Sequence, residues 1–342
     1  MNTNNFEKTE QINVDMRPVI SLCIPSSGRV QFLERNLDAI YSQNVNTDLF
    51  EVCISDNSSD DNTENLLKTK YSDKSNIVYK KSSEHSYLNL IEALKLGSGK
   101  YLKLLNDYTF FSDNNILKYM ISIVEKYDNT NSVLFFNFSN PQESIHECEN
   151  IDEFIKTVSY MNTSAPCFGI YKTSFDSITN KGIAYNVWFP HLSLLYSKPN
   201  SKFVVINKKI LSSVPVKKKG GYNLPMVFGK EYISMNECLL NNLKISKSSY
   251  NFLRLETLDF IATWYSMSIY DKKHCAFDFS DMDKWLSYYF SETEVKEFYN
   301  LVKKHSRDRL IRKILFLPLF VIRKMRYYKN GSYLGGGDTS IV

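Results

Sequence analysis

The sequence VISLCIPSSGR, residues 19–29, decides the fold of the N-terminal half of the chain. Val19–Ile24 is an apolar run of the kind expected for a strand buried on both faces of a parallel sheet. The polar loop Pro25–Arg29 follows it, and Val30–Gln43 then places apolar side chains at helical spacing. A buried strand, a short polar loop and an amphipathic helix are the repeating parts of an α/β sheet.

The same parts recur through the first third of the chain. We expect strands at Phe50–Ser55, Ile77–Tyr79, Tyr101–Leu105 and Val133–Phe138, with helices between them. This alternation predicts an α/β fold with a mostly parallel sheet flanked by helices. Ligands bind such sheets at the carboxyl ends of the strands, which singles out the loops Pro25–Arg29, Asp56–Asn62 and Asn106–Ser112. These loops contain neither GxGxxG nor GxxxxGK[ST], so dinucleotide-binding and P-loop proteins are not indicated.

Composition indicates a globular chain, since 43% of the 342 residues are hydrophobic and 23% are charged. The 6 cysteines are scattered without a CxxC pair, and Met1–Met16 has no apolar signal-peptide core. We therefore expect a cytoplasmic protein. The net charge of +5 is uneven, because ten Lys or Arg residues against Asp308 give +9 between Lys303 and Lys329, which leaves −4 elsewhere. This basic character is local and needs a local explanation.

The order of these parts resembles glycosyltransferase family 2 with the GT-A fold, and in particular its abequosyltransferase-like subgroup of bacterial O-antigen and capsule enzymes. Val19–Arg29 is similar to the opening strand of that family and its loop, and Ser55–Thr63 (SDNSSDDNT) to its acidic turn. Gly97–Leu105 (GSGKYLKLL) is similar to the stretch that leads into the metal-binding strand. Ala165–Lys172 and Asn186–Leu195 resemble acceptor-side segments of the subgroup. The likeness covers roughly residues 18 to 240.

The resemblance implies a binding site for a nucleotide sugar. It assigns recognition of the base to Asp56, whose carboxylate can accept an N–H of the ring; alternatively, Asp56 only closes an Asx-type turn with Asn57 and Ser58. Arg29 either lines the base and ribose pocket or is an ordinary surface residue in the first helical turn. The full predicted set is Pro25, Ser26, Ser27, Arg29, Asp56, Asn57, Asn89, Asn106 and Asp107.

The metal-binding motif of the family is incomplete in this chain. The resemblance implies Asp-x-Asp, which holds Mg²⁺ or Mn²⁺ on the diphosphate, but Asn106 and Tyr108 stand at the carboxylate positions and only Asp107 remains. Asp107 is the candidate metal ligand and a candidate catalytic residue. The alternative is that Lys80, Lys81 or Lys103 neutralises the diphosphate, and we expect weak or absent metal dependence.

An inverting transfer needs a general base beside the acceptor hydroxyl. Asn186–His191 (NVWFPH), which resembles the family's base-carrying stretch, has no carboxylate. His191 is therefore the catalytic candidate, because histidine titrates near neutral pH; alternatively it caps the following helix. Asp176 is a second candidate. Trp188 and Phe189 form either a platform for the acceptor sugar or part of the core.

The C-terminal segment Leu310–Ile322 (LIRKILFLPLFVI) is flanked by cations, and its unbroken apolar part is Ile314–Ile322. It is shorter than the roughly 20 residues of a spanning helix and includes Pro318, so an amphipathic helix at the inner face of the cell membrane fits better than docking on the protein or on nucleic acid.

We expect four regions: a nucleotide-sugar-binding half (17–140), an acceptor-side region (141–300), a membrane-associating tail (301–330) and a disordered end (331–342). The predicted function is inverting transfer of a sugar from a nucleoside-diphosphate sugar to a lipid-linked oligosaccharide in surface polysaccharide synthesis. A silent sugar-nucleotide-binding scaffold and a sugar nucleotidyltransferase are the alternatives. The sequence does not indicate the oligomeric state.

Overall fold

The computed structural model describes residues 17–84, 86–128, 130, 132–140, 142–213, 219–270 and 275–329, with side chains as far as residue 311. It contains two compact units. Unit 1 comprises Met1–Val216 and Ser234–Arg254, and unit 2 comprises Lys217–Ile233 and Leu255–Val342. This division differs from the predicted boundary at residue 140, because strands on both sides of that residue pair with one another.

The main sheet of unit 1 has five strands in the order β3-β2-β1-β4-β8. They are β1 (Ile20–Ser26), β2 (Phe50–Asp56), β3 (Ile77–Lys81), β4 (Tyr101–Leu104) and β8 (Gly169–Tyr171). The first four are parallel, and β8 pairs antiparallel with β4. The predicted parallel sheet is thus confirmed, although β1 extends over Pro25 and Ser26, which we expected in the loop.

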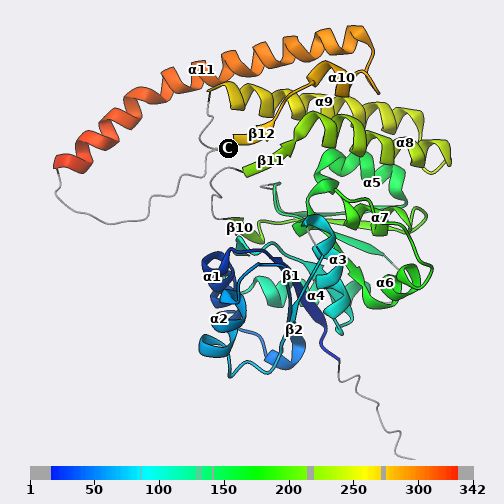
Figure 1. Cartoon of the computed structure of the whole chain (residues 1–342), viewed down its shortest axis with the longest axis vertical. Coiled ribbons are helices and arrows are strands. Elements are labelled where there is room, and N and C mark those ends of the chain that lie inside the picture. Colours follow the sequence, from blue (N-terminus) through cyan, green and yellow to red (C-terminus); the bar gives the residue numbers. More distant parts are fainter. Residues whose placement is uncertain are drawn as a thin grey trace, which may run out of the picture. The chain divides into compact units, whose positions relative to one another are not determined.

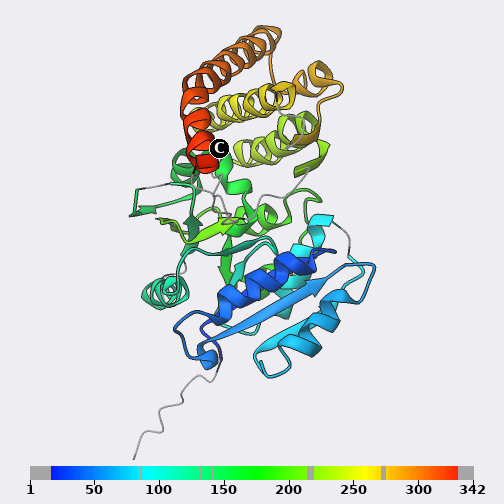
Figure 2. The same ribbon diagram turned by 90° about the vertical axis from the view of Figure 1, so that its left-hand side faces the viewer.

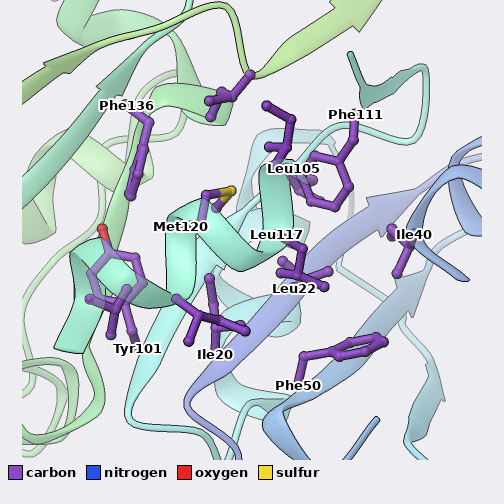
Figure 3. Close-up of a cluster of buried hydrophobic side chains, with 14 of the residues drawn as sticks. Ile20, Leu22, Ile40, Phe50, Tyr101, Leu105, Phe111, Leu117, Met120 and Phe136 are labelled. Atoms are coloured by element: carbon purple, nitrogen blue, oxygen red, sulfur yellow. The ribbon is translucent and has the colours of Figure 1, made fainter. Parts of the chain in front are cut away.

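The helices that follow these strands are α1 (Val30–Tyr41), α2 (Asn62–Lys70), α3 (Asn89–Leu96) and α4 (Ile116–Tyr127). Side chains alternate along a strand, so Ile20, Leu22 and their neighbours form one face of the sheet, against α1 and α4. Figure 3 shows Leu117 and Met120 of α4 packed over Ile20 and Leu22 in this core. Helix α3 packs against β1 and β2, and Figure 1 shows α1 and α2 on one side of these strands and α3 on the other.

Gly99 shows why the turn before β4 needs glycine. Its N–H lies 2.9 Å from Ser21 Oγ on β1, and a Cβ there would lie 2.7 Å from the same oxygen. Glu51 of β2 accepts hydrogen bonds from the same turn, including that of Gly99 N–H at 3.0 Å. The GSGK stretch therefore fixes the start of β4 against β1 and β2.

Among the described residues, the rest of unit 1 contains two smaller, separate sheets. Strands β6 (Val133–Asn137), β9 (Phe203–Asn207) and β7 (Ser144–Cys148) form a second sheet in that order, and β5 (Thr109–Phe111) pairs with β10 (Leu211–Ser213). The predicted strand at Val133–Phe138 exists as β6, but it belongs to the second sheet. Helices α5 (Ile151–Val158), α6 (Lys172–Thr179), α7 (Pro190–Tyr196) and most of α8 (Ile233–Asn241) complete the unit.

Unit 2 is mainly helical. It contains a π-helix (Pro225–Tyr232), α10 (Met282–Leu286), α11 (Glu292–Lys329), the later part of α9 (Lys247–Tyr270) and the parallel strands β11 (Lys219–Asn223) and β12 (Cys275–Asp278). Helix α11 continues past Pro318 as one coil, orange to red in Figure 2, so the predicted tail at 301–330 belongs to a longer helix that begins at Glu292. No helix among the described residues is long and apolar enough to span a membrane. The predicted disordered end, 331–342, lies outside the described residues.

Candidate functional site

The three loops singled out by the sequence meet at the carboxyl ends of the parallel strands. The register pairs Ser26 with Asp56 and Asp56 with Lys81, so the last residues of β1, β2 and β3 lie in one row. Gly28 N–H donates to Ser58 Oγ at 2.7 Å, which joins the first loop to the second. Gly28 has a φ of 63°, a left-handed conformation that glycine adopts without strain. Arg29 joins the first loop to the third through Asp107.

Asp56 is fully buried at the end of β2. Its Oδ1 accepts the Ser58 backbone N–H at 3.0 Å and the Ser58 hydroxyl. Its Oδ2 accepts longer hydrogen bonds of 3.3 Å from Tyr79 OH and 3.3 Å from Lys81 Nζ. The Asx-type turn that we considered as an alternative therefore exists, and it holds one carboxylate oxygen while the other keeps only weak partners.

Two polar atoms beside Asp56 have no partner among the described residues. Ser26 is 1% exposed and its Oγ makes no hydrogen bond. Asn57 donates through Nδ2 to Glu84 O at 3.1 Å, while its buried Oδ1 accepts nothing. Leaving a buried polar group unpaired costs on the order of 1–3 kcal/mol, so these atoms mark a place where a polar ligand is expected. Pro25 is half-buried and Ser27 is exposed at the same edge.

Asn89 is buried beneath this edge at the start of α3. Its Oδ1 accepts the Ser55 hydroxyl at 2.7 Å, and its Nδ2 donates to Ser55 O at 2.8 Å. Both polar atoms of the Asn89 side chain are therefore hydrogen-bonded to Ser55 of strand β2. Asn89 holds the strand ends in place, and direct contact with a ligand, which we predicted, does not fit this placement.

Arg29 and Asp107 form the main charged pair of the site. Arg29 Nε donates to Asp107 Oδ1 at 3.1 Å and Oδ2 at 2.9 Å. Burial raises the pKa of Asp107, while Arg29 and the backbone N–H groups of Ser27 and Tyr108 act in the opposite direction. The Arg29 guanidinium lies 5.5 Å from the centre of the Tyr108 ring.

This loop does not fit a divalent metal ion. The oxygens of Asp107, the single carboxylate of Asn106–Ser112, already accept a guanidinium and two backbone N–H groups. Asn106 Nδ2 donates to Tyr108 OH at 2.9 Å. Mg²⁺ beside a diphosphate is usually held by one or two carboxylates together with phosphate and water oxygens, and here a positive guanidinium already contacts both oxygens of the single carboxylate. Elsewhere in unit 1, His146, Cys148 and Glu153 bring ligand atoms within 4.8 Å of one another, but they lie on β7 and α5, outside these loops.

The three lysines considered for the diphosphate differ in their surroundings. Lys80 pairs with Glu92 at 3.3 Å, and Lys81 pairs with Asp56 at 3.3 Å. Lys103 is fully buried and donates to the carbonyl oxygens of Leu104 at 2.8 Å, Pro166 and Phe168 at 3.2 Å. Burial lowers the pKa of Lys103 to about 7. The proposed contact of Lys103 with a diphosphate is therefore wrong, because its amine joins β4 to the Ala165–Gly169 segment inside the core.

His191 lies in the interior of unit 1, with 2% of its surface exposed. Its Nε2 lies 3.2 Å from Asn162 O, and its ring packs 5.8 Å from that of Phe168. Burial lowers the pKa of His191 to about 4. A buried imidazole does not reach an acceptor hydroxyl in this conformation, which argues against the predicted role as general base. Asp176 is paired with Lys172 on α6 at 2.5 Å.

Of the two aromatic residues proposed as a platform, Phe189 is buried in the core, while Trp188 is half-buried. The Trp188 ring lies 5.9 Å from that of Tyr87, which is on the segment between β3 and α3. Tyr87 also acts electrostatically on Tyr108. Tyr87 and Trp188 thus form one aromatic contact, and Tyr108 lies beside the Arg29 guanidinium.

A cavity of about 700 Å³ lies in unit 1 next to α7 and α8, away from the strand-end loops. Asn186, Ser193 and Tyr196 line it on the α7 side, and Met235 and Leu239 on the α8 side. Asn186 Oδ1 accepts the N–H groups of Trp188 and Phe189, both at 2.9 Å. The cavity therefore adjoins the Asn186–Leu195 segment that we expected on the acceptor side.

Sequence reasoning missed the contributions of Tyr79 and Tyr87. For Tyr79 the signal was available: Tyr79 and Lys81 are two residues apart on a strand, so they share a face and both reach Asp56 of the neighbouring strand. Tyr87 carried no such signal, because its neighbour Trp188 is far away in the sequence.

The parallel strand order, the helices on both faces and the polar loops at the strand ends are those of an α/β domain that binds its ligand at the strand ends. Residues 21–169 match the model of glycosyl transferase family 2. This part of the chain is therefore a family 2 glycosyltransferase domain, as the resemblance predicted.

Two comparisons place the domain among known proteins. The chain is 32% identical over 115 residues to abequosyltransferase RfbV of Salmonella typhimurium strain LT2, an alignment that covers 32% of each protein, so it spans about a third of that relative. The structure of S. aureus TarS 1–349 with UDP-GlcNAc is similar with a TM-score of 0.55 and 15% identity, over 84% of this chain and 80% of that one. TarS 1–349 with UDP gives a TM-score of 0.51 and 15% identity over 94% of each chain. At this identity the two structures support the GT-A fold alone.

Proposed function

We propose that this protein is an inverting glycosyltransferase that moves a sugar from a nucleoside-diphosphate sugar to a saccharide acceptor. The observation that carries this proposal is the pair of buried, unpartnered atoms, Ser26 Oγ and Asn57 Oδ1, beside Asp56 at the sheet edge. The family 2 domain and its abequosyltransferase relative support the same activity.

Asp56 is the proposed acceptor for an N–H of the nucleobase. Ser58 fixes Oδ1, whereas the contacts of Oδ2 with Tyr79 and Lys81, both 3.3 Å long, are weak enough to yield to a base N–H. Ser26 Oγ and Asn57 Oδ1 then supply a donor and an acceptor to the other polar atoms of the base or ribose.

The reaction proceeds in one displacement. The bond between the anomeric carbon and the diphosphate oxygen breaks, and its electron pair stays on the diphosphate. The acceptor oxygen forms the new bond from the opposite face, and the hydroxyl proton passes to water. Asp107 takes part by holding Arg29, and His191 has a structural role in this proposal.

The acceptor side is proposed to include the rings of Tyr87 and Trp188 and the cavity beside α7. Aromatic rings commonly pack on the apolar faces of sugars, since they bury area without losing a hydrogen bond. The basic, apolar sequence Leu310–Ile322 supports a lipid-linked acceptor at the inner face of the cell membrane, in O-antigen or capsule synthesis.

Donor binding by the full-length protein tests the site. A thermal-shift screen with UDP, GDP, TDP and CMP sugars should find one responding nucleotide. Ser26→Ala should weaken its binding about three- to tenfold, because one hydrogen bond is lost. Ser72→Ala, at an exposed serine in the connection between α2 and β3, is the matched control and should leave binding unchanged. If the two variants weaken donor binding equally, the buried residues at the sheet edge are not part of the donor site.

Product analysis separates the alternatives. Transfer or hydrolysis of the sugar with release of the nucleotide supports a glycosyltransferase. Binding without turnover toward any acceptor points to a scaffold, and release of pyrophosphate from a nucleoside triphosphate and a sugar phosphate points to a nucleotidyltransferase.

A further inference from the structure

We propose that Arg29, held in place by Asp107, binds the diphosphate of the donor and takes over the role that a divalent metal ion has in Asp-x-Asp enzymes. This inference rests on the proposed function, because it assumes a nucleoside-diphosphate donor at the strand-end loops.

The Arg29–Asp107 pair is built for holding a cation in one orientation. Asp107 is 0% exposed, whereas the side chain of Arg29 is 38% exposed, so the carboxylate is covered and the guanidinium reaches the surface. Only Nε contacts Asp107, at 2.9 and 3.1 Å from its two oxygens. The guanidinium also lies over the Tyr108 ring, 5.5 Å from its centre, so it is in contact from a second side.

The outer edge of the guanidinium is available to a ligand. Among the described residues, the terminal nitrogens of Arg29 make no hydrogen bond, because both side-chain hydrogen bonds of Arg29 run through Nε. Two terminal N–H groups on a fixed plane match two oxygens of a phosphate, and such bidentate contacts are both strong and directional.

The start of α1 adds donors at the same place. Arg29 is the N-cap residue of α1 and gives no side-chain cap. The Arg29 carbonyl accepts the N–H groups of Phe32 and Leu33, so those of Val30 and Gln31 have no partner within the described part of this helix. An uncapped helix N-terminus favours phosphate, and the buried, unpartnered Ser26 Oγ lies at the end of the preceding strand.

A metal ion in this position would have to displace Arg29 from the only carboxylate of the loop. The two cations would then compete for a single negative charge, which is unfavourable. This explains the incomplete Asp-x-Asp motif, because the Arg29 guanidinium replaces the metal ion as the cation of the site. Asp107 orients this guanidinium and does not coordinate Mg²⁺ or Mn²⁺.

The test measures binding of nucleoside diphosphates and monophosphates of uridine, guanosine, thymidine and cytidine to the full-length protein by calorimetry. Titrations are made in EDTA and again with Mg²⁺ or Mn²⁺. The diphosphate of the responding base should bind more tightly than its monophosphate, and the metal ions should change its Kd less than about twofold.

Three variants assign the effect to Arg29. Arg29→Lys keeps the charge but loses the two terminal N–H groups of the guanidinium. It should lower the affinity for the diphosphate about tenfold while leaving the affinity for the monophosphate unchanged. Asp107→Asn should lower the affinity for the diphosphate equally in EDTA and in the presence of Mg²⁺ or Mn²⁺. Arg35→Lys, an exposed arginine on the same helix, is the matched control and should change neither ligand.

The outcomes are distinguishable. Diphosphate binding that disappears in EDTA and returns with Mn²⁺ overturns the role of Arg29 and leaves the proposed function standing. If Arg29→Lys lowers the affinities for the monophosphate and the diphosphate equally, the proposed role of Arg29 is also overturned, because Arg29 would then contact the part that both nucleotides share. No binding of any nucleotide, with or without metal, would refute the proposed function together with this inference.

Discussion

Replacing His191 by Gln separates a structural histidine from a catalytic one. Gln has a terminal amide nitrogen at nearly the same distance from the backbone as Nε2, so it can keep a hydrogen bond to Asn162 O. It does not titrate. The variant therefore removes the protonation of residue 191 with little change in packing.

The magnitude follows from the lowered pKa of His191. The folded protein holds this pKa at about 4, below the ordinary value of 6.5 that applies to the unfolded chain. Between these values the unfolded chain binds more protons, so the free energy of unfolding falls as the pH drops through this window. One pKa unit corresponds to about 1.4 kcal/mol, and the loss from above pH 7 to about pH 5 amounts to about 2 kcal/mol.

The assay is urea unfolding of wild type and His191→Gln at about pH 5 and about pH 7.5. The wild type should lose about 2 kcal/mol more than the variant over this range. His146→Gln, at a half-exposed histidine on β7, controls for removal of a histidine as such.

Activity of the same variant completes the test. A general base contributes about 10²- to 10⁴-fold to the rate, whereas a structural histidine should leave kcat within a few fold at neutral pH. A variant that unfolds like wild type at both pH values, yet loses more than about 100-fold in kcat, would refute the buried, structural role of His191.

Three further changes test other parts of the molecule. Lys103→Met should destabilise unit 1 by about 1–3 kcal/mol in urea unfolding, because the carbonyls of Pro166 and Phe168 lose their donor; a gain in stability would contradict the role of the amine. Trp188→Ala should lower transfer to the acceptor while leaving donor affinity unchanged, and an equal loss of both in calorimetry and transfer assays would place Trp188 at the donor. Deleting residues 310–342 should abolish co-sedimentation with anionic vesicles, since each cation contributes about 1 kcal/mol at such a surface, and the truncated protein should still bind the donor nucleotide.

Local patterns in the sequence were sufficient to predict the main sheet of unit 1. Apolar runs and helical periodicity depend on neighbouring residues, so β1, β2, β4 and α1 appear within a few residues of their predicted bounds. One element end differs: Pro25 and Ser26, which we expected in the loop, continue β1, because pairing with the neighbouring strand outweighs the local preference of proline.

The sequence by itself determined the α/β class, the three loops that meet at the strand ends, and the absence of a complete Asp-x-Asp motif. Tertiary structure alone decided what the charged residues do there. Arg29 and Asp107 are 78 positions apart, and Lys103 lies 63 positions from the Pro166 carbonyl that it contacts. Burial and partner choice depend on which segments the fold brings together, and no local pattern in the chain encodes that.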